Sequence, residues 1–221
     1  AGADTADAIA VRGTSVTIDV RAGTLEQAER AEGVDIGLRV FVGQRAANVS
    51  ASDTSSRTIE EMAQRAVAMA REAPDPSQLS TSWDVDALEL HDPAPEPDAA
   101  TLQDDAMRAE AAALAVKGVE QVQGSSATYG AQHVYLSATN GFEGGYKRTN
   151  RGMSCVAISG TGTGMERDYA GDSRTFQTEL RAPEDIGTEA GTRVLERMGA
   201  IQPPTGSYPV LFDERVSSTL I

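Results

Sequence analysis

The sequence VDIGLRVFV, at residues 34–42, carries the clearest structural signal in the chain. Every second residue is apolar, and these residues are Val34, Ile36, Leu38, Val40 and Val42. Successive side chains of a β-strand point to opposite faces, so this alternation gathers the apolar side chains on a single face. The stretch therefore predicts a β-strand with one face in a core.

The residues on both sides extend this strand into a predicted meander. Upstream, apolar residues alternate imperfectly in two groups with Gly13 between them, and a hairpin turn follows. Residues 25–32 predict a polar strand at an edge, which Gly33 breaks. Downstream, a short turn leads into a further strand at residues 46–52. The N-terminal part of the chain is thus predicted to be a set of antiparallel strands.

Three segments have helical periodicity, and they are residues 58–73, 101–117 and 183–198. The first begins with a capping box in which Glu61 reaches back to the amide of Thr58, and Pro74 ends it. The second has a face that allows close packing, made of Ala106, Ala109 and Ala113, and Gly118 closes it. The third has Pro183 at its start and acidic residues in its first turn.

A second group of strands is predicted between the second and third helices. Its segments are residues 119–127, 133–138, 142–150, 154–160 and 165–170, with turns at 140–141 and 160–164. Residues 208–212 predict a short strand, and a helix is predicted from Asp213 onward. Runs of strands separated from runs of helices indicate an α+β fold, with antiparallel or mixed sheets and about three packing helices.

A proline-rich segment at residues 74–98 divides the chain into sub-blocks 1–75 and 98–221 of one region, residues 1–221. Its apolar residues Trp83, Leu88 and Leu90 indicate that it wraps around the domain instead of linking two independent parts. The predicted final helix would leave its last carbonyls and the apolar residues Leu220 and Ile221 without cover, so we expect truncation, proteolysis or disorder beyond it instead of a natural end.

Composition limits the function. The net charge is −14, and the chain has only two lysines, so direct nucleic-acid binding is not expected. The acidic excess is typical of a surface that keeps a protein soluble. No apolar run is long enough for a membrane span, so a membrane partner is not expected either. The single cysteine, Cys155, lies in a predicted buried strand, which favours a structural thiol over a nucleophile.

The usual catalytic patterns are missing from the sequence. The two histidines, His91 and His133, lie far apart and on no predicted helix with a second ligand, so a shared metal site is not expected. No G-x-S-x-G elbow is present. The glycine-rich stretch at residues 159–164 lacks the ending of a phosphate-binding loop and is better interpreted as a hairpin turn. No catalytic residue and no metal ligand are therefore predicted.

Two polar groups remain as candidates for contact with a peptide or a partner. The first is Asn140 with Gly141, at a predicted turn. The second is Arg167, Asp168 and Tyr169, in the densest polar cluster on a predicted strand. A structural ion pair between Arg167 and Asp168 is the alternative interpretation of the second group.

Several stretches together resemble the PmbA/TldE branch of the TldD/PmbA family, whose members have been described as modulators of DNA gyrase. The stretches are residues 33–41, 50–53, 92–93, 137–141, 154–155, 165–170, the helix at 183–198 and residues 209–212. No single motif is specific, but their order and spacing run through nearly the whole chain. The resemblance implies the N-terminal part of such a protein.

The resemblance also implies a function. Family members are longer than this chain and have a C-terminal β domain, which is absent here. A TldD-type subunit carries zinc on a His-Glu-x-x-x-His helix, whereas a TldE-type subunit lacks those ligands and pairs with TldD. The pair cleaves small or unfolded peptides and is associated with microcin maturation and antitoxin turnover. For this chain we therefore expect a cytoplasmic, non-catalytic subunit without a cofactor of its own, a TldD-like partner that holds zinc, and a peptide substrate.

Three alternatives stay open. A homodimer could form in addition to the heterodimer. The protein could instead be a regulatory protein that binds DNA gyrase. It could also be a self-sufficient TldD-type metallopeptidase, because the helix predicted from Asp213 is the one that carries the zinc motif in TldD and the chain stops at Ile221.

Overall fold

The computed structural model describes residues 2–74 and 88–217. Their strands are β1 (Thr5–Arg21), β2 (Thr24–Val42), β3 (Arg45–Ala51), β4 (Gln121–Ala138), β5 (Glu143–Ser159) and β6 (Glu166–Arg174). Their helices are α1 (Ser56–Glu72), α2 (Ala99–Ala115), α3 (Pro183–Glu196) and the short α4 (Glu214–Ser217). Among the helices of this part of the chain, none is long and apolar enough to span a membrane.

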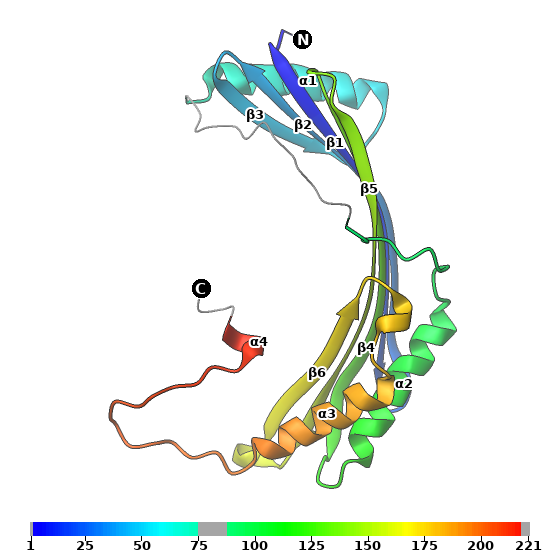
Figure 1. The fold of residues 1–221 in the computed structure, drawn as a ribbon, viewed down its shortest axis with the longest axis vertical. Coiled ribbons are helices and arrows are strands. Elements are labelled where there is room, and N and C mark those ends of the chain that lie inside the picture. Colours follow the sequence, from blue (N-terminus) through cyan, green and yellow to red (C-terminus); the bar gives the residue numbers. More distant parts are fainter. Residues whose placement is uncertain (1, 75–87, 218–221) are drawn as a thin grey trace.

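The strands form one antiparallel sheet in the order β3-β2-β1-β4-β5-β6. Four of them have 17 to 19 residues, so the sheet is long and narrow. Register shifts occur between β1 and β2 at Asp19/Val20 and between β4 and β5 at Val122/Gly124, at the same end of the sheet. Such irregularities increase the local twist, and the sheet curves into the crescent seen in Figure 1.

Helices cover only one face of this sheet, at its two ends. Val16 of β1 lies in the core under α2 and α3, and Val40 of β2 lies in a second core under α1. Ala6 is the cross-strand partner of Val40, and Ala6 and Val16 are an even number of residues apart on β1 with no bulge between them. Their side chains therefore share a face, so α1, α2 and α3 all lie on one side of the sheet, and the opposite face is here called the helix-free face because none of these three helices covers it.

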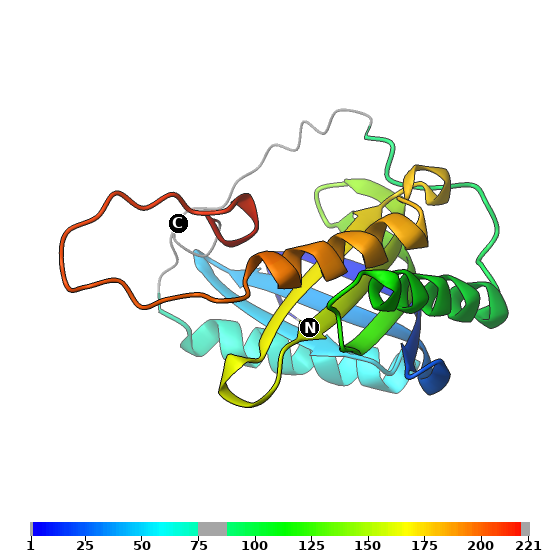
Figure 2. The same ribbon diagram turned by 90° about the horizontal axis from the view of Figure 1, so that it is seen from below.

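Small residues bring α2 and α3 into close contact (Figure 2). The predicted alanine face of α2 is confirmed, because Ala106, Ala109 and Ala113 are all completely buried. A Cβ atom added to Gly187 of α3 would lie 2.0 Å from the carbonyl oxygen of Ala109. The two helices can therefore approach this closely only because α3 has glycine at that position.

The proline-rich segment does wrap around the domain in its described part, residues 88–98, here called the strap. The carbonyl oxygen of Leu90 accepts a hydrogen bond from the Thr149 amide of β5 at 2.9 Å, and Glu96 pairs with Arg30 of β2. The strap thus crosses the helix-bearing face between α1 and α2 (Figure 1). The prediction that Leu88 is an apolar anchor is wrong, because Leu88 is 63% exposed. Trp83 lies outside the described residues.

Several predicted element boundaries are wrong. Gly33 does not break a strand, because it lies within β2 and pairs directly with Gly13 in the middle of β1. The breaks predicted at residues 128–132 and 151–153 do not occur. The two strands predicted on either side of each break form one continuous strand, β4 and β5 respectively. Cross-strand pairing along the full length of neighbouring strands stabilises these polar and glycine-containing stretches, which local pattern alone marks as breaks.

Two terminal predictions also need correction. Helix α1 begins at Ser56 with Ser55 as its N-cap, whose hydroxyl accepts from the Thr58 amide at 3.3 Å, so Thr58 is not the cap. Residues 208–212 form no strand. They belong to an exposed segment in which Leu211 is 98% accessible, and they pair with no neighbouring strand.

Candidate functional site

The candidate group on β6 is a buried carboxylate surrounded by arginines. The Asp168 side chain is 6% exposed, and its carboxylate accepts from Nη1 of Arg215 at 2.9 Å and from its neighbour's amide, that of Tyr169, at 2.7 Å. Arg197 of the α3 C-terminus lies 3.6 Å away. The guanidinium of Arg215 also lies 5.3 Å from the centre of the Tyr169 ring, within cation–π range.

These contacts determine the ionisation of the group. Burial alone would raise the pKa of Asp168, but the hydrogen bond from Arg215 and the amide of Tyr169 outweigh burial and hold its pKa below the ordinary value. Arg215 in turn has its pKa raised by Asp213 and Asp168. Both groups are therefore charged at neutral pH, and the ion pair holds α4 against β6.

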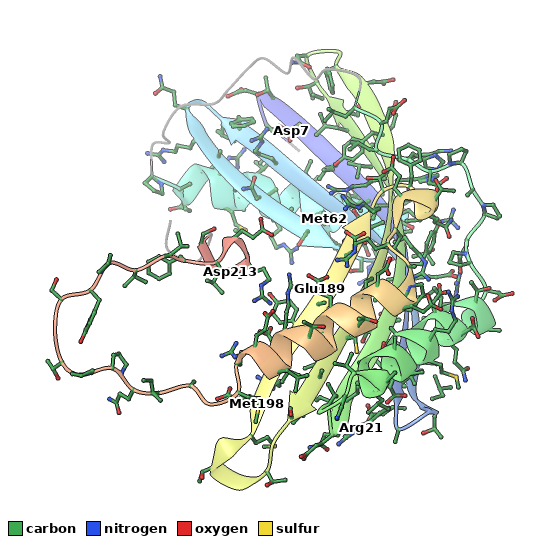
Figure 3. The ribbon with its side chains drawn as sticks, turned by 60° about the horizontal axis from the view of Figure 1, so that its bottom comes forward. Asp7, Arg21, Met62, Glu189, Met198 and Asp213 are labelled. Carbon is green, nitrogen blue, oxygen red and sulfur yellow. The ribbon has the colours of Figure 1, made fainter. Side chains whose placement is uncertain are left out.

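Arg193 and Arg215 cap a carbonyl group on the outer edge of β6. The carbonyl oxygen of Tyr169 accepts from Nη1 of Arg193 and from Nη1 of Arg215, each at 3.3 Å. Arg193 is held in place by Glu189 at 2.5 Å on the same helix, and Figure 3 shows Glu189 on α3 with Asp213 on the segment that leads to α4. A carbonyl group on the edge strand that is already capped cannot pair with an incoming strand at that position.

The other candidate pair lies at the opposite end of the sheet. Asn140 and Gly141 form the tip of the β4–β5 hairpin, where the Asn140 side chain accepts from the Phe142 amide at 3.0 Å. Gly141 has φ of +89°, which suits glycine at a tight turn. Because β5 has 17 residues, about 50 Å of strand, at 3.3 Å per residue, separates the tip from the level of Arg167. The structure therefore separates the two predicted groups.

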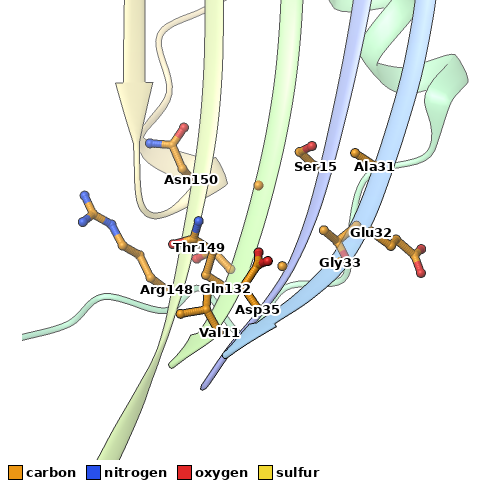
Figure 4. A pocket seen from close by; sticks show the side chains of 13 residues that line it. Val11, Ser15, Ala31, Glu32, Gly33, Asp35, Gln132, Arg148, Thr149 and Asn150 are labelled. Atoms are coloured by element: carbon orange, nitrogen blue, oxygen red, sulfur yellow. The ribbon is translucent and has the colours of Figure 1, made fainter. Parts of the chain in front are cut away.

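A depression on the helix-free face was missed by the sequence interpretation. It has a volume of about 500 Å³ and is open to solvent (Figure 4). Its floor is formed by Gly13, Gly33 and Gly130 on the adjacent strands β1, β2 and β4. At Gly33 and Gly130 no heavy atom lies within 4 Å of the place where a Cβ atom would be.

Polar side chains surround this glycine floor. Asp35 lies on the β2 side, and Gln132, Arg148 and Asn150 lie on the β4–β5 side. A floor without side chains allows a flat group or an extended chain to approach the sheet closely, and the polar rim offers hydrogen-bond donors and acceptors. The signal in the sequence is the presence of glycines within strands, which indicates close approach of another group.

Neither a metal-binding cluster nor an exposed thiol is found within the described residues. In these two stretches of chain, no three His, Cys, Asp or Glu side chains gather so that they could hold a metal ion. Cys155 is completely buried, and burial raises the pKa of its thiol to about 12. The predicted structural role of this thiol is thereby confirmed, because a protonated and inaccessible thiol is not a nucleophile.

Two family models match most of the chain. The model for the PmbA/TldA metallopeptidase domain 1 matches residues 6–70, and the model for the PmbA/TldA metallopeptidase central domain matches residues 92–198. The residues between the two matches, 71–91, include the first residues of the strap.

Among curated proteins, the chain is similar to the metalloprotease PmbA of Escherichia coli O157:H7, with 30% identity over 227 residues. That match covers 98% of this chain and 50% of the relative. A metalloprotease PmbA homolog of Haemophilus influenzae is 27% identical, over 94% of this chain and 48% of its own length. The chain thus spans about half the length of these relatives.

Solved structures share the fold. A protein from Thermotoga maritima, named as a candidate modulator of a DNA gyrase, superposes with a TM-score of 0.78 at 13% identity, over 91% of this chain and 46% of its own. A protein with the corresponding name from Bacteroides thetaiotaomicron gives 0.75 at 22% identity, over 91% and 48%. TldE from Thermococcus kodakarensis gives 0.70 at 15% identity, over 87% and 44%.

Proposed function

The chain belongs to the PmbA/TldD metallopeptidase family, and from this premise we propose that it is the N-terminal part of a non-catalytic subunit in a zinc peptidase complex. In this proposal a TldD-like partner holds the zinc ion and hydrolyses small or unfolded peptides. The present chain shapes the space in which the peptide is held. A regulatory role, in which the protein binds DNA gyrase, is the alternative.

The residues of this chain support a role without chemistry of its own. The described residues do not form a zinc site, since His133 is exposed on β4 and His91 lies in the strap, with no third ligand gathered around either. Asp168 is engaged by Arg215 and Arg197. No step of hydrolysis is therefore assigned to any residue here.

The observation that carries the proposal is the open, glycine-floored face of the sheet. In most proteins both faces of a sheet are covered by other elements, or the face toward solvent carries polar side chains. Here three adjacent strands place glycine at the centre of the uncovered face. Such a face suits a peptide or the surface of a second subunit that lies flat against it.

The test uses the full-length protein, alone and mixed with a purified TldD-like subunit. Zinc is measured by elemental analysis, and cleavage of an unfolded peptide is followed by mass spectrometry. We expect this protein alone to contain little zinc and to cleave no peptide. When it is combined with the partner, the cleavage rate should exceed that of the partner alone.

Three results would contradict the proposal. Stoichiometric zinc with cleavage by this protein alone would assign it to the self-sufficient type, as would a His-Glu-x-x-x-His helix following residue 221 in the full-length sequence. Equal activity of the partner with and without this protein would exclude the subunit role. Capture of purified gyrase at physiological salt without a TldD-like partner would favour the regulatory alternative.

A further inference from the structure

Three basic residues form a row across the helix-bearing face, between its two helical layers. Arg12 of β1 is the direct cross-strand partner of His133 of β4, and His133 is the direct partner of Lys147 of β5. Direct partners in an antiparallel pair point to the same side of a sheet. Arg12 shares the face of Val16, which lies under α2 and α3, so this basic row is on the opposite side from the glycine floor.

The basic row lies in a groove of its own. A depression of about 540 Å³ is lined by Arg12, His133 and Lys147 together with Val34 and Tyr135. The strap bounds it on one side, because the strap bonds to Thr149, two residues along β5 from Lys147. Val34 is 36% exposed and Tyr135 is 51% exposed, so apolar surface is open to solvent beside the charges.

Tyr135 gives the groove a fixed wall. Its ring lies over Gly145, its cross-strand partner, where an added Cβ atom would meet ring atom Cδ2 at 3.0 Å. Its hydroxyl donates to Oε2 of Glu143 at 3.2 Å. The negative charge of Glu143, and the hydrogen bond to it, raise the pKa of the Tyr135 hydroxyl. The ring is therefore held at both ends.

The charges of the basic row have no acidic partner in residues 2–74 and 88–217. No ion pair within 4.0 Å involves Arg12, His133 or Lys147, whereas most other arginines of these stretches have one. Two carboxylates on the same face are engaged elsewhere, since Glu32 binds Arg30 and Glu143 accepts from Tyr135. The positive charges of Arg12 and Lys147, one on each side of His133, can therefore attract an anion from solvent.

We propose that the basic row is a docking site for an extended acidic segment of a partner polypeptide. Neighbouring strands are about 4.8 Å apart, so Arg12 and Lys147 are about 10 Å apart with His133 between them. Carboxylates on alternate residues of an extended chain are about 7 Å apart, so two such residues can contact both ends of the row. Val34 and Tyr135 then contact apolar side chains of the same segment.

The charge distribution selects a polypeptide over a nucleic acid. The protein has a net charge of −14, and the three basic residues occupy one row with carboxylates on either side. A polyphosphate chain would meet repulsion beyond that row, whereas a short acidic motif would not. This site goes beyond the proposed peptidase role, because it is on the other face and is tested by binding alone.

The test measures binding of the full-length protein to two fluorescein-labelled peptides by fluorescence anisotropy. One peptide alternates glutamate with valine, and the other alternates lysine with valine. The variant is R12Q/K147Q. The control is R65Q/K117Q, which loses the same two charges at exposed positions on α1 and after α2.

We expect the glutamate peptide to bind more tightly than the lysine peptide and to weaken with added salt. R12Q/K147Q should weaken its binding about fivefold, as expected for two exposed charge contacts, and the control should leave it unchanged. The charge-preserving variant R12K/K147R should bind like the wild type. Equal weakening in the variant and the control, or no preference for the glutamate peptide, would overturn the proposal. Circular dichroism shows whether each variant is folded.

Discussion

At the scale of single residues, Asp92 shows how one buried carboxylate holds the strap. Its carboxylate accepts from the Gln177 amide at 2.7 Å and from the Ala94 amide at 2.9 Å, and its own amide donates to the Thr149 hydroxyl at 2.7 Å. The hydrogen bond from the Gln177 amide, followed by that from Ala94, lowers the pKa of Asp92. The strap, the interior of β5 and the segment after β6 thus meet at one residue, Asp92.

The lowered pKa predicts a pH dependence for Asp92→Asn. A carboxylate with a depressed folded-state pKa contributes stability above its unfolded pKa, about 3.9, and loses it as pH falls through the folded-state value. We expect Asp92→Asn to lower the free energy of unfolding by about 1–3 kcal/mol at pH 7, because an amide cannot accept both bonds. The difference from wild type should shrink below about pH 4, measured by urea unfolding.

The control is Asp104→Asn, a substitution at an exposed position, which should change the free energy of unfolding little at pH 7 or below pH 4. A difference between wild type and Asp92→Asn that stays constant from pH 7 to acid would show that the carboxylate charge does not hold the strap.

Also at this scale, the interpretation of Asp168 changes with the structure. The sequence suggested Arg167 as its structural partner, but Arg167 donates to Gln123 at 3.0 Å instead. Successive residues of a strand point to opposite faces, so Arg167 and Asp168 cannot meet. The observed partner, Arg215, is distant in sequence and belongs to no local pattern. Contact of Asp168 or Tyr169 with a peptide or partner stays a prediction.

At the scale of elements, the contact between α2 and α3 depends on the absence of side-chain atoms. Gly187 and Gly191 of α3 face Ala109 and Val116, and a Cβ atom at Gly191 would lie 2.8 Å from a methyl carbon of Val116. Helix propensity alone favours alanine over glycine by about 1 kcal/mol. At these positions packing therefore favours glycine, whereas helix propensity favours alanine.

We expect Gly187→Ala to destabilise the protein by about 1–3 kcal/mol, because its Cβ atom would overlap the Ala109 carbonyl group and force the helices apart. The measurement is the free energy of unfolding in urea. Thr188→Ala, on the exposed side of the same turn, is the control and should be neutral or slightly stabilising. A gain of stability at Gly187 would mean that the helices are not in contact there.

At the scale of the whole molecule, the sheet has two faces with different roles. One face carries both helical layers, the strap and the basic row. The other carries the glycine floor and is not covered by α1, α2 or α3. Because the strands run the full length of the sheet, both faces are continuous surfaces and their roles can be tested separately.

Gly33→Thr fills the floor without a steric cost, because no atom lies within 4 Å of its new Cβ atom. We expect stability to stay the same or to rise by up to about 1 kcal/mol from strand propensity. In the complex with a TldD-like partner, kcat/KM for peptide cleavage should fall about tenfold if the face holds a peptide or the partner. Ala28→Thr, on the same strand and the opposite face, is the control. Loss of activity in both variants, or in neither, would contradict this role.

The sequence by itself determined the α+β class, the three main helices and the hairpin turns at residues 140–141 and 160–164, because local periodicity and turn chemistry encode them. Its motifs also identified the family. Only the tertiary structure decided that Gly13 and Gly33 lie within strands, that Arg215 binds Asp168, and that Arg12, His133 and Lys147 form one row. These features depend on strand register and on contacts between distant segments, and a single strand's pattern contains neither.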